Sequence, residues 1–303
     1  MTLLLKTFCK GNNMSDNYEH LFEFAELKEL DKPVLILALD GWIDSSGIAH
    51  SAKESLLSKA EIYTMVKFDT DRLLDHRARR PVLHLNEGVV ENLEWPSIEL
   101  LHIEGLEGRD TCVLHGPEPD HDWKVFTDAV TNICYGLDVS LVIGLGAYPA
   151  AVPHTRPTRL SCTASSIEMA AKLDFVTASI KVPAGLQAVI EAEVALAGTP
   201  AIGLWAQVPH YLSTGPYPPA TVALLEGLRE ISGIWNRDFK LDQNALNTRS
   251  RLDQLIGNNE EHLTMIEKLE IAYDELNDPG SSLPSGDDLA EELQNFLRSQ
   301  DDI

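Results

Sequence analysis

The stretch that decides the fold class of this 303-residue chain is Leu141-Val-Ile-Gly-Leu-Gly-Ala-Tyr-Pro-Ala-Ala-Val-Pro-His154-Thr-Arg156-Pro-Thr-Arg159. Its first part is a continuous apolar run, the pattern of a strand that is buried on both faces of a sheet. Its second part is rich in proline and carries one histidine and two arginines, which predicts a polar loop. The segment Ala201-Ile-Gly-Leu-Trp-Ala-Gln-Val-Pro-His210-Tyr211 repeats this design.

Other buried strands alternate with helices along the chain. Apolar runs typical of strands occur at residues 33–39, 62–68, 98–103, 111–115, 139–145, 175–181 and 201–207. Helical spacing or composition is found at residues 45–59, 122–136, 186–196 and 220–231. This alternation predicts an α/β fold, a three-layer αβα sandwich with a mostly parallel sheet and helices on both faces. We expect this core domain to span residues 21–235.

The two ends of the chain differ in composition from that core. Residues 1–20 are polar and aperiodic, which predicts a flexible arm, and either Met1 or Met14 could be the true start. Residues 236–278 predict a helical extension or hairpin, and residues 279–303 an acidic linker followed by a tail helix. Residues 241–303 hold 15 acidic and four basic side chains, so the C-terminal fifth is the most acidic part of the chain.

Composition excludes several classes of function. The formal net charge of −23 opposes binding to nucleic-acid phosphates or anionic lipid, which requires clustered Lys and Arg. No apolar run is long enough to span a membrane, and the N-terminus lacks the pattern of a secretory signal, so we expect a cytoplasmic protein. Four widely spaced cysteines predict reduced core residues, although Cys162, next to the polar loop, could be a nucleophile. Arg77-Ala-Arg-Arg80 is the one basic cluster, either a solvated loop or a contact for an acidic ligand or a second copy.

The helical extension carries a heptad-like apolar seam. Because its residues follow three-four spacing, they predict a surface that binds another copy or a partner helix. The alternative is an intramolecular hairpin, broken at Gly257-Asn-Asn, whose seam packs on the core. The seam consists of Leu252, Leu255, Ile266, Leu269, Tyr273 and Leu276.

Polar residues gather where the predicted strands end. Ligands of open parallel sheets bind beyond the carboxyl ends of the strands, so a pocket is expected there. His154, Arg156 and Arg159 could bind a carboxylate or phosphate; the alternative is that they hydrogen-bond loop carbonyl groups and fasten turns. The candidate pocket residues are Asp40, Gly41, Trp42, His154, Arg156, Arg159, Gln187, His210 and Tyr211.

Motifs for catalysis and cofactor binding are missing. The chain has no P-loop, no Gly-x-Ser-x-Gly elbow and no His-Glu-x-x-His, and Gly144-Leu-Gly146 lacks the third glycine of a dinucleotide site. Asp120-His121-Asp122 favours a helix N-cap over a metal site, because adjacent side chains diverge. We therefore expect no cofactor and no metal, and the sequence leans against an enzyme.

The segments Gly146–Pro157 and Leu204–Tyr211, together with Asp40-Gly41-Trp42 and Ala184–Gln187, resemble the proteasome assembly chaperone 2 family. The likeness covers about residues 20–235 and fits the uncharacterised prokaryotic branch that is typical of actinobacteria. It implies a three-layer fold similar to phosphorylases and peptidyl-type hydrolases without their catalytic residues, and frequent homo-oligomers, so a trimer or dimer is expected.

The resemblance also implies a function. Eukaryotic relatives are chaperones of proteasome α-subunits and often dock through a C-terminal hydrophobic-Tyr-any tripeptide, whereas this chain ends Asp301-Asp302-Ile303. The leading hypothesis is a non-catalytic assembly or interaction factor. The alternative is an enzyme or binding protein for a small anionic metabolite, which includes the ATP-grasp carboxylate-amine ligase label that some relatives carry. The sequence has no glycine-rich loop with a paired lysine to support that label.

Overall fold

The computed structural model describes residue 18 and residues 20–26, 28–41, 43–58, 60–171, 175, 179, 181–236, 238–257 and 259–276. The strands in this part of the chain are β1 Phe22–Phe24, β2 Val34–Asp40, β3 Glu61–Phe68, β4 Val82–Asn86, β5 Val89–Glu94, β6 Glu99–Glu104, β7 Thr111–Pro117, β8 Leu141–Ala150, β9 Leu160–Ala164 and β10 Ala201–Pro209. The helices are α2 Ile48–Leu57, α3 Thr70–Leu73, α4 Trp123–Gly136, α5 Ile167–Ala170, α6 Leu186–Leu196, α7 Pro218–Ser232, α8 Phe239–Ile256 and α9 Glu260–Leu276, with short 3-10 turns η2 Ser45–Gly47 and η3 His210–Leu212.

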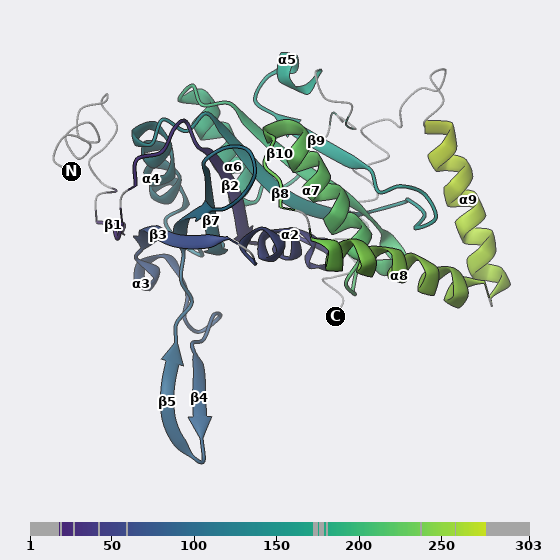
Figure 1. Cartoon of the computed structure of the whole chain (residues 1–303), viewed down its shortest axis with the longest axis horizontal. Helices are drawn as coiled ribbons and strands as arrows, with labels where there is room; N and C mark the ends of the chain where they lie inside the picture. The colour runs from purple at the N-terminus through teal and green to yellow at the C-terminus, as the bar shows by residue number, and fades with distance from the viewer. Residues whose placement is uncertain are drawn as a thin grey trace. The chain divides into compact units, whose positions relative to one another are not determined.

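Eight of the strands form one mixed sheet, in the order β1-β3-β6-β7-β2-β8-β10-β9 (Figure 1). β2 runs parallel to both of its neighbours, β7 and β8, and is buried along most of its length. At one edge, β1, β3 and β6 are antiparallel to the strands beside them. The predicted α/β fold, a helix-flanked sheet with a C-terminal helical extension, is confirmed.

The chain divides into two compact units, and both are discontinuous in sequence. The first holds the described residues up to Gly41, with Leu57–Gly144 and Ala184–Ile202. The second holds Ile43–Leu56, Leu145–Pro183 and the described residues from Gly203 onward. The sequence predicts one core domain over residues 21–235, and segments of this range belong to both units.

In the first unit, helices α4 and α6 pack against the sheet and against each other. Their apolar residues recur every three or four positions, so that each helix buries one face. On α6 this face is Leu186, Ile190 and Val194, all fully buried. On α4, Phe126 and Ile133 belong to the same apolar cluster.

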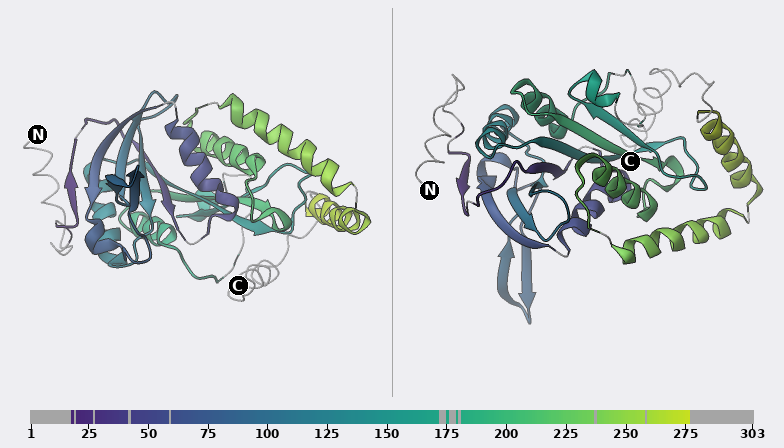
Figure 2. Two further views of the ribbon diagram at one scale, coloured as in Figure 1. Left: turned by 90° about the horizontal axis from the view of Figure 1, so that it is seen from below. Right: turned by 45° about the horizontal axis from the view of Figure 1, so that its top comes forward.

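In the second unit, α7 packs against β9 and α8 packs along α7. The approach of α7 to β9 requires a glycine, because a Cβ at Gly227 would lie 2.3 Å from Leu160 Cδ1. α8 ends at Ile256, and α9 then leaves in a new direction (Figure 2). The predicted break at Gly257 is therefore the junction between the two helices.

The remaining strands, β4 and β5, form a separate two-stranded hairpin that extends from the first unit (Figure 1). Glu87 and Gly88 connect them, both with positive φ, as a two-residue type I′ turn requires. This hairpin was not predicted from the sequence.

One predicted strand is longer in the structure. β8 continues through Pro149 to Ala150, beyond the predicted end at residue 145, because Pro149 tolerates extended backbone. The strand predicted for residues 175–181 lies mostly outside the described residues, as do the N-terminal arm and the acidic tail after residue 276. Within the described residues, no helix has the length and apolarity to cross a membrane.

Candidate functional site

His154 is the buried centre of the polar loop that follows β8. Its side chain is only 1% exposed, in the second unit. Its backbone N–H donates to the Tyr211 hydroxyl over 2.8 Å, and the same hydroxyl lies 2.8 Å from the ring atom Nδ1. On the other side of the ring, Nε2 lies 3.3 Å from Asp253 Oδ1 of α8, without the alignment of a hydrogen bond. His154 thus connects the loop to η3 and faces α8.

These contacts define the protonation of the pair. Burial lowers the pKa of His154, and the nearby Asp253 carboxylate opposes that shift only in part. Burial also raises the pKa of Tyr211, so its hydroxyl keeps its proton. Since this hydroxyl accepts the His154 backbone N–H, its own proton is available to Nδ1, and the imidazole proton is then on Nε2, facing Asp253. A neutral imidazole fixed in this way anchors the loop.

Arg156 fastens the same loop to α9. Its guanidinium donates two hydrogen bonds to Asp274, from Nε over 2.9 Å and from Nη2 over 2.7 Å, and a third from Nη1 to Glu270 over 2.9 Å. Thr155 also donates to Glu270. The hydrogen bonds to Asp274 are the main cause that raises the pKa of Arg156. This bidentate fork binds the carboxylates of the chain itself, at the place where an external anion was expected.

Arg159 makes a third attachment to α9. Its Nη2 donates to the Tyr273 carbonyl over 3.1 Å, and its guanidinium carbon lies 4.0 Å from the centre of the Tyr273 ring. The Tyr273 hydroxyl donates in turn to the Pro157 carbonyl over 2.9 Å. The loop and α9 are therefore held together by reciprocal contacts, in addition to the burial of Tyr273 beside Ala150 of β8 and Val152 of the loop.

The structure thus brings His154 and Tyr211 together, with His210 at the edge of the Tyr211 ring. It uses Arg156 and Arg159 for the attachment of α9. The hypothesis of an anion pocket at these residues remains without support from their contacts. The alternative that they fasten loops describes the observed hydrogen bonds.

Asp40 and Gly41 belong to the first unit, where Glu118 is their neighbour. The Glu118 N–H donates to the Asp40 carbonyl over 2.8 Å, and its carboxylate accepts the Leu186 N–H over 2.5 Å. Glu118 therefore caps the N-terminus of α6, where negative charge is favourable. Sequence reasoning missed Glu118, because its target lies 68 residues further along the chain. Trp42 lies outside the described residues.

Gln187 is on α6 in the first unit, and its side chain lies against β8. Its Nε2 donates to Glu191 Oε1 over 3.1 Å, and both side chains lie directly against Gly144. Gly146, in the second unit, is covered by the Trp205 ring. The two glycines let these side chains pack close to β8. Packing therefore accounts for Gly144 and Gly146, and a bound dinucleotide is not needed to explain them.

The thiols of three cysteines and the Asp122 carboxylate are the other potentially reactive groups. Burial raises the pKa of Cys112 and of Cys134 to about 12, and it raises that of Cys162. Asp122 makes no capping hydrogen bond, contrary to expectation, because its carboxylate accepts one from Arg72 Nε over 2.6 Å. In the part of the chain that the structure describes, no three His, Cys, Asp or Glu side chains gather as metal ligands would.

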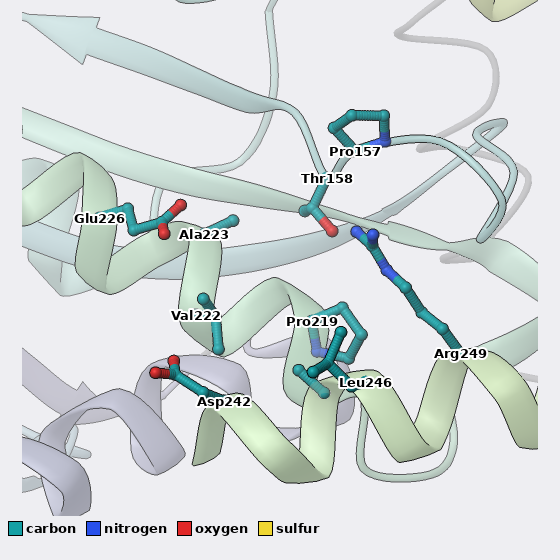
Figure 3. Close-up of a pocket in the computed structure, with 10 residues that line it drawn as sticks. Pro157, Thr158, Pro219, Val222, Ala223, Glu226, Asp242, Leu246 and Arg249 are labelled. Atoms are coloured by element: carbon teal, nitrogen blue, oxygen red, sulfur yellow. The ribbon is translucent and has the colours of Figure 1, made fainter. Parts of the chain in front are cut away.

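An open pocket of about 460 Å³ lies in the second unit, between α7, α8 and the 157–158 turn (Figure 3). The Arg249 guanidinium points toward Thr158 at one end, and Glu226 and Asp242 lie away from it. None of the nine sequence-predicted residues lines this pocket. Its lining residues are Pro157, Thr158, Pro219, Val222, Ala223, Glu226, Asp242, Ala245, Leu246 and Arg249.

The predicted seam is divided between α8 and α9. Ile266 and Tyr273 of α9 are buried in the chain itself, and Leu269 is half-buried. Leu255 of α8 is exposed and Leu252 is half-buried. The side chain of Leu276 lies outside the described part of the structure. The two buried residues pack intramolecularly, as the hairpin alternative expects for that part of the seam.

Several solved structures with this architecture come from actinobacteria. A Corynebacterium glutamicum protein of unknown function has a TM-score of 0.80 and 26% identity, over 86% of this chain and all of its own. A Mycobacterium tuberculosis proteasome-assembly chaperone homologue has a TM-score of 0.70 and 29% identity, over 77% of this chain and 99% of its own. A Streptomyces avermitilis PAC2 family protein has a TM-score of 0.68 and 30% identity, over 77% and 99%. No curated protein matches the chain.

The family of the chain is identified by a match to a family model. The model of the PAC2 family matches residues 38–256, which is most of the chain and includes the end of β2, the loop of His154 and helix α8. The resemblance expected from the sequence is therefore confirmed, and the chain belongs to the PAC2 family.

Proposed function

We propose that this protein is a non-catalytic assembly or interaction factor that acts on protein subunits. The observation that carries the proposal is the use of the loop's polar groups. His154, Arg156 and Arg159 are engaged by Tyr211, Glu270, Asp274 and Tyr273 of the same chain. A loop whose side chains hold η3 and α9 in place supports a binding surface, whereas catalysis requires reactive groups that substrate can reach.

Proteasome subunits are the first partner to test. The M. tuberculosis relative is described as a proteasome-assembly chaperone homologue, and its identity to this chain extends over most of both proteins. The helical extension also exposes large apolar side chains that could contact a subunit, namely Phe239, Leu246, Leu255, Leu263 and Ile271. We place this activity in the cytoplasm, in a homo-oligomer.

The experiment is a reconstitution with purified proteasome α-type subunits from the same organism, followed by native mass spectrometry. A species that contains both chains, together with faster ring assembly, is the expected result. A Leu255→Asp and Ile271→Asp variant should lose that species, whereas Arg251→Gln, an exposed change on α8, should keep it. If neither protein changes the mass or assembly rate of the other, the proteasome is not the partner.

Arg249 favours a second candidate function, the binding of a small anion. This guanidinium forms no hydrogen bond or ion pair within the described residues, and it lies beside Thr158, whose hydroxyl is buried without a hydrogen-bond partner. A carboxylate or phosphate could satisfy both groups.

A thermal-shift series with acetate, citrate and inorganic phosphate tests this candidate. A ligand that binds only the folded state must raise the unfolding temperature. The rise should disappear in Arg249→Gln and persist in Arg251→Gln. Equal behaviour of the two variants would contradict an anion site in this pocket.

A further inference from the structure

The β4–β5 hairpin has one face of aliphatic side chains only and one mixed face, on which Val82 and Val89 stand among polar side chains. Leu83 pairs with Leu93 across the two strands, and Leu85 pairs with Val90, so these four side chains point to the same side. The opposite face carries two contacts between polar side chains. There, His84 Nε2 lies 3.1 Å from Glu94, and Asn86 donates to Glu91 over 2.7 Å.

Nothing in the described residues covers the apolar face. Its four side chains are between 46% and 59% exposed, although all are aliphatic. An isolated two-stranded hairpin is at best marginally stable in water, and a third element normally covers such a face. The hairpin therefore has the composition of a surface that is buried in an assembly.

The charges at the two ends of the hairpin are opposite. Glu87 and Glu91 lie near its tip, because residues 87 and 88 form the turn. At its base is the loop with Arg77 and Arg80, which is placed there by the contact between the His76 and Trp95 rings, 5.0 Å apart. The Arg77 and Arg80 guanidinium groups have no ion-pair partner among the described residues, whereas Arg79 binds Asp120.

We propose that the hairpin is a self-association surface, occupied by the hairpin of a second copy of this chain. The two apolar faces pack together in antiparallel orientation, so the tip of one hairpin lies at the base of the other. Glu87 then meets the partner's Arg77 and Arg80, and a two-fold axis repeats this contact. A tip-to-tip orientation would instead place like charges together.

A second copy fits this surface because the hairpin segment carries an apolar face, an acidic tip and a basic base, and each of these complements the same segment of another copy. A net charge of −23 makes general self-contact unfavourable, and the only basic cluster of the chain is at the base of this hairpin. The proposal gives a contact surface to the homo-oligomer of the proposed function, but its tests use the purified chain alone, so their failure is distinguishable from a failure to bind protein subunits.

The first test removes the apolar face. Leu85→Asn with Val90→Asn is compared with Val82→Asn and Val89→Asn, which remove two aliphatic side chains from the opposite face. Sedimentation equilibrium over a range of concentrations should show a dimer for the unmodified protein and for the control pair. The apolar-face pair should weaken association about 100-fold or more, because two buried aliphatic contacts are lost. Equal masses for both pairs, or a monomer for the unmodified protein, would overturn the proposal.

The second test exchanges the charges. One variant carries Arg77→Glu and Arg80→Glu, and the other carries Glu87→Lys. Each alone has like charges at both ends of the contact and should be monomeric, whereas an equimolar mixture should form a heterodimer with opposite charges at both ends. Failure of the mixture to associate, or undiminished association of either variant alone, rules out the tip-to-base arrangement.

Discussion

Gly144 shows how a single residue on β8 is determined by its surroundings. A Cβ at this position would lie 2.1 Å from Glu191 Oε1 and 2.3 Å from Gln187 Nε2, which real contacts do not allow. The glycine of an apparent nucleotide motif is therefore required by packing in the first unit.

We expect Gly144→Ala to lower the free energy of unfolding by about 1–3 kcal/mol, because the inserted methyl group forces buried side chains to move. Urea denaturation measures the change. Gly215→Ala is the matched control, since an added Cβ there meets nothing within 4 Å. If both variants unfold at the same urea concentration, the close packing of Gln187 and Glu191 does not constrain β8.

The buried His154 ring gives the stability of the protein a dependence on pH. Its pKa is lowered in the fold by burial from an ordinary value of 6.5, so the unfolded chain binds this proton more readily. Stability from this group is complete above about pH 6.5 and is lost as the pH falls toward the lower folded pKa.

Thermal unfolding at pH 7.5 and pH 5.5 measures this effect. His154→Gln should be less stable overall but should show a smaller difference between the two pH values than the unmodified protein. His210→Gln, a change at an exposed histidine, should retain the full difference. An unchanged pH dependence in His154→Gln would contradict the assignment of a neutral imidazole.

Among the elements, α9 depends on a few long-range contacts. Few of its side chains are buried, and its attachment rests on Tyr273 and on the hydrogen bonds from Arg156 and Arg159. A bidentate fork of arginine has no equivalent in lysine.

Arg156→Lys should therefore loosen α9 without unfolding the core. We expect amide hydrogen exchange in residues 260–276 to accelerate about tenfold, as in local opening, while the rates in β2 and α6 stay the same. Arg251→Lys, on the exposed side of α8, should have no effect. Acceleration throughout the chain would instead mean that α9 and the core unfold together.

The same elements show what the sequence could predict. β2, β7 and β10 follow from continuous apolar runs, and α6 follows from Ala and Glu composition that ends at Gly198-Thr-Pro200. The β4–β5 hairpin was missed because its apolar alternation contains no Asn-Gly or Asp-Gly turn, and Glu87 adopts positive φ in its place.

The candidate site was predictable only as a set of residue types. The sequence placed His154, Tyr211 and the two arginines near strand ends, which the structure shows. It could not assign Arg156 to Asp274, because the pair is separated by 118 residues and three-four spacing gives no signal for it. Neither could it find the Arg249 pocket, which exists only where α8 packs along α7.

For the whole molecule, the charge of −23 is the dominant electrostatic feature. Repulsion among carboxylates destabilises the compact state, and salt screens it over a Debye length of about 10 Å at 0.1 M. We expect the unfolding temperature to rise between about 0.05 M and about 0.5 M NaCl, and KCl to give the same rise. A fall would show that local pairs such as Arg156 with Asp274 outweigh the general repulsion.

The interleaved segments of the two units determine when each can fold during synthesis. The first unit needs Ala184–Ile202, so it stays incomplete until residue 202 of 303 has left the ribosome. Helix α2 is made early but belongs with segments that begin at Leu145 and Gly203. At translation rates of about 5–20 residues per second, the nascent α2 waits roughly 7–30 s for the last of them. During that interval Ile48, Ala52 and Leu56 remain uncovered by their final neighbours, so the nascent helix exposes an apolar face that a chaperone could bind.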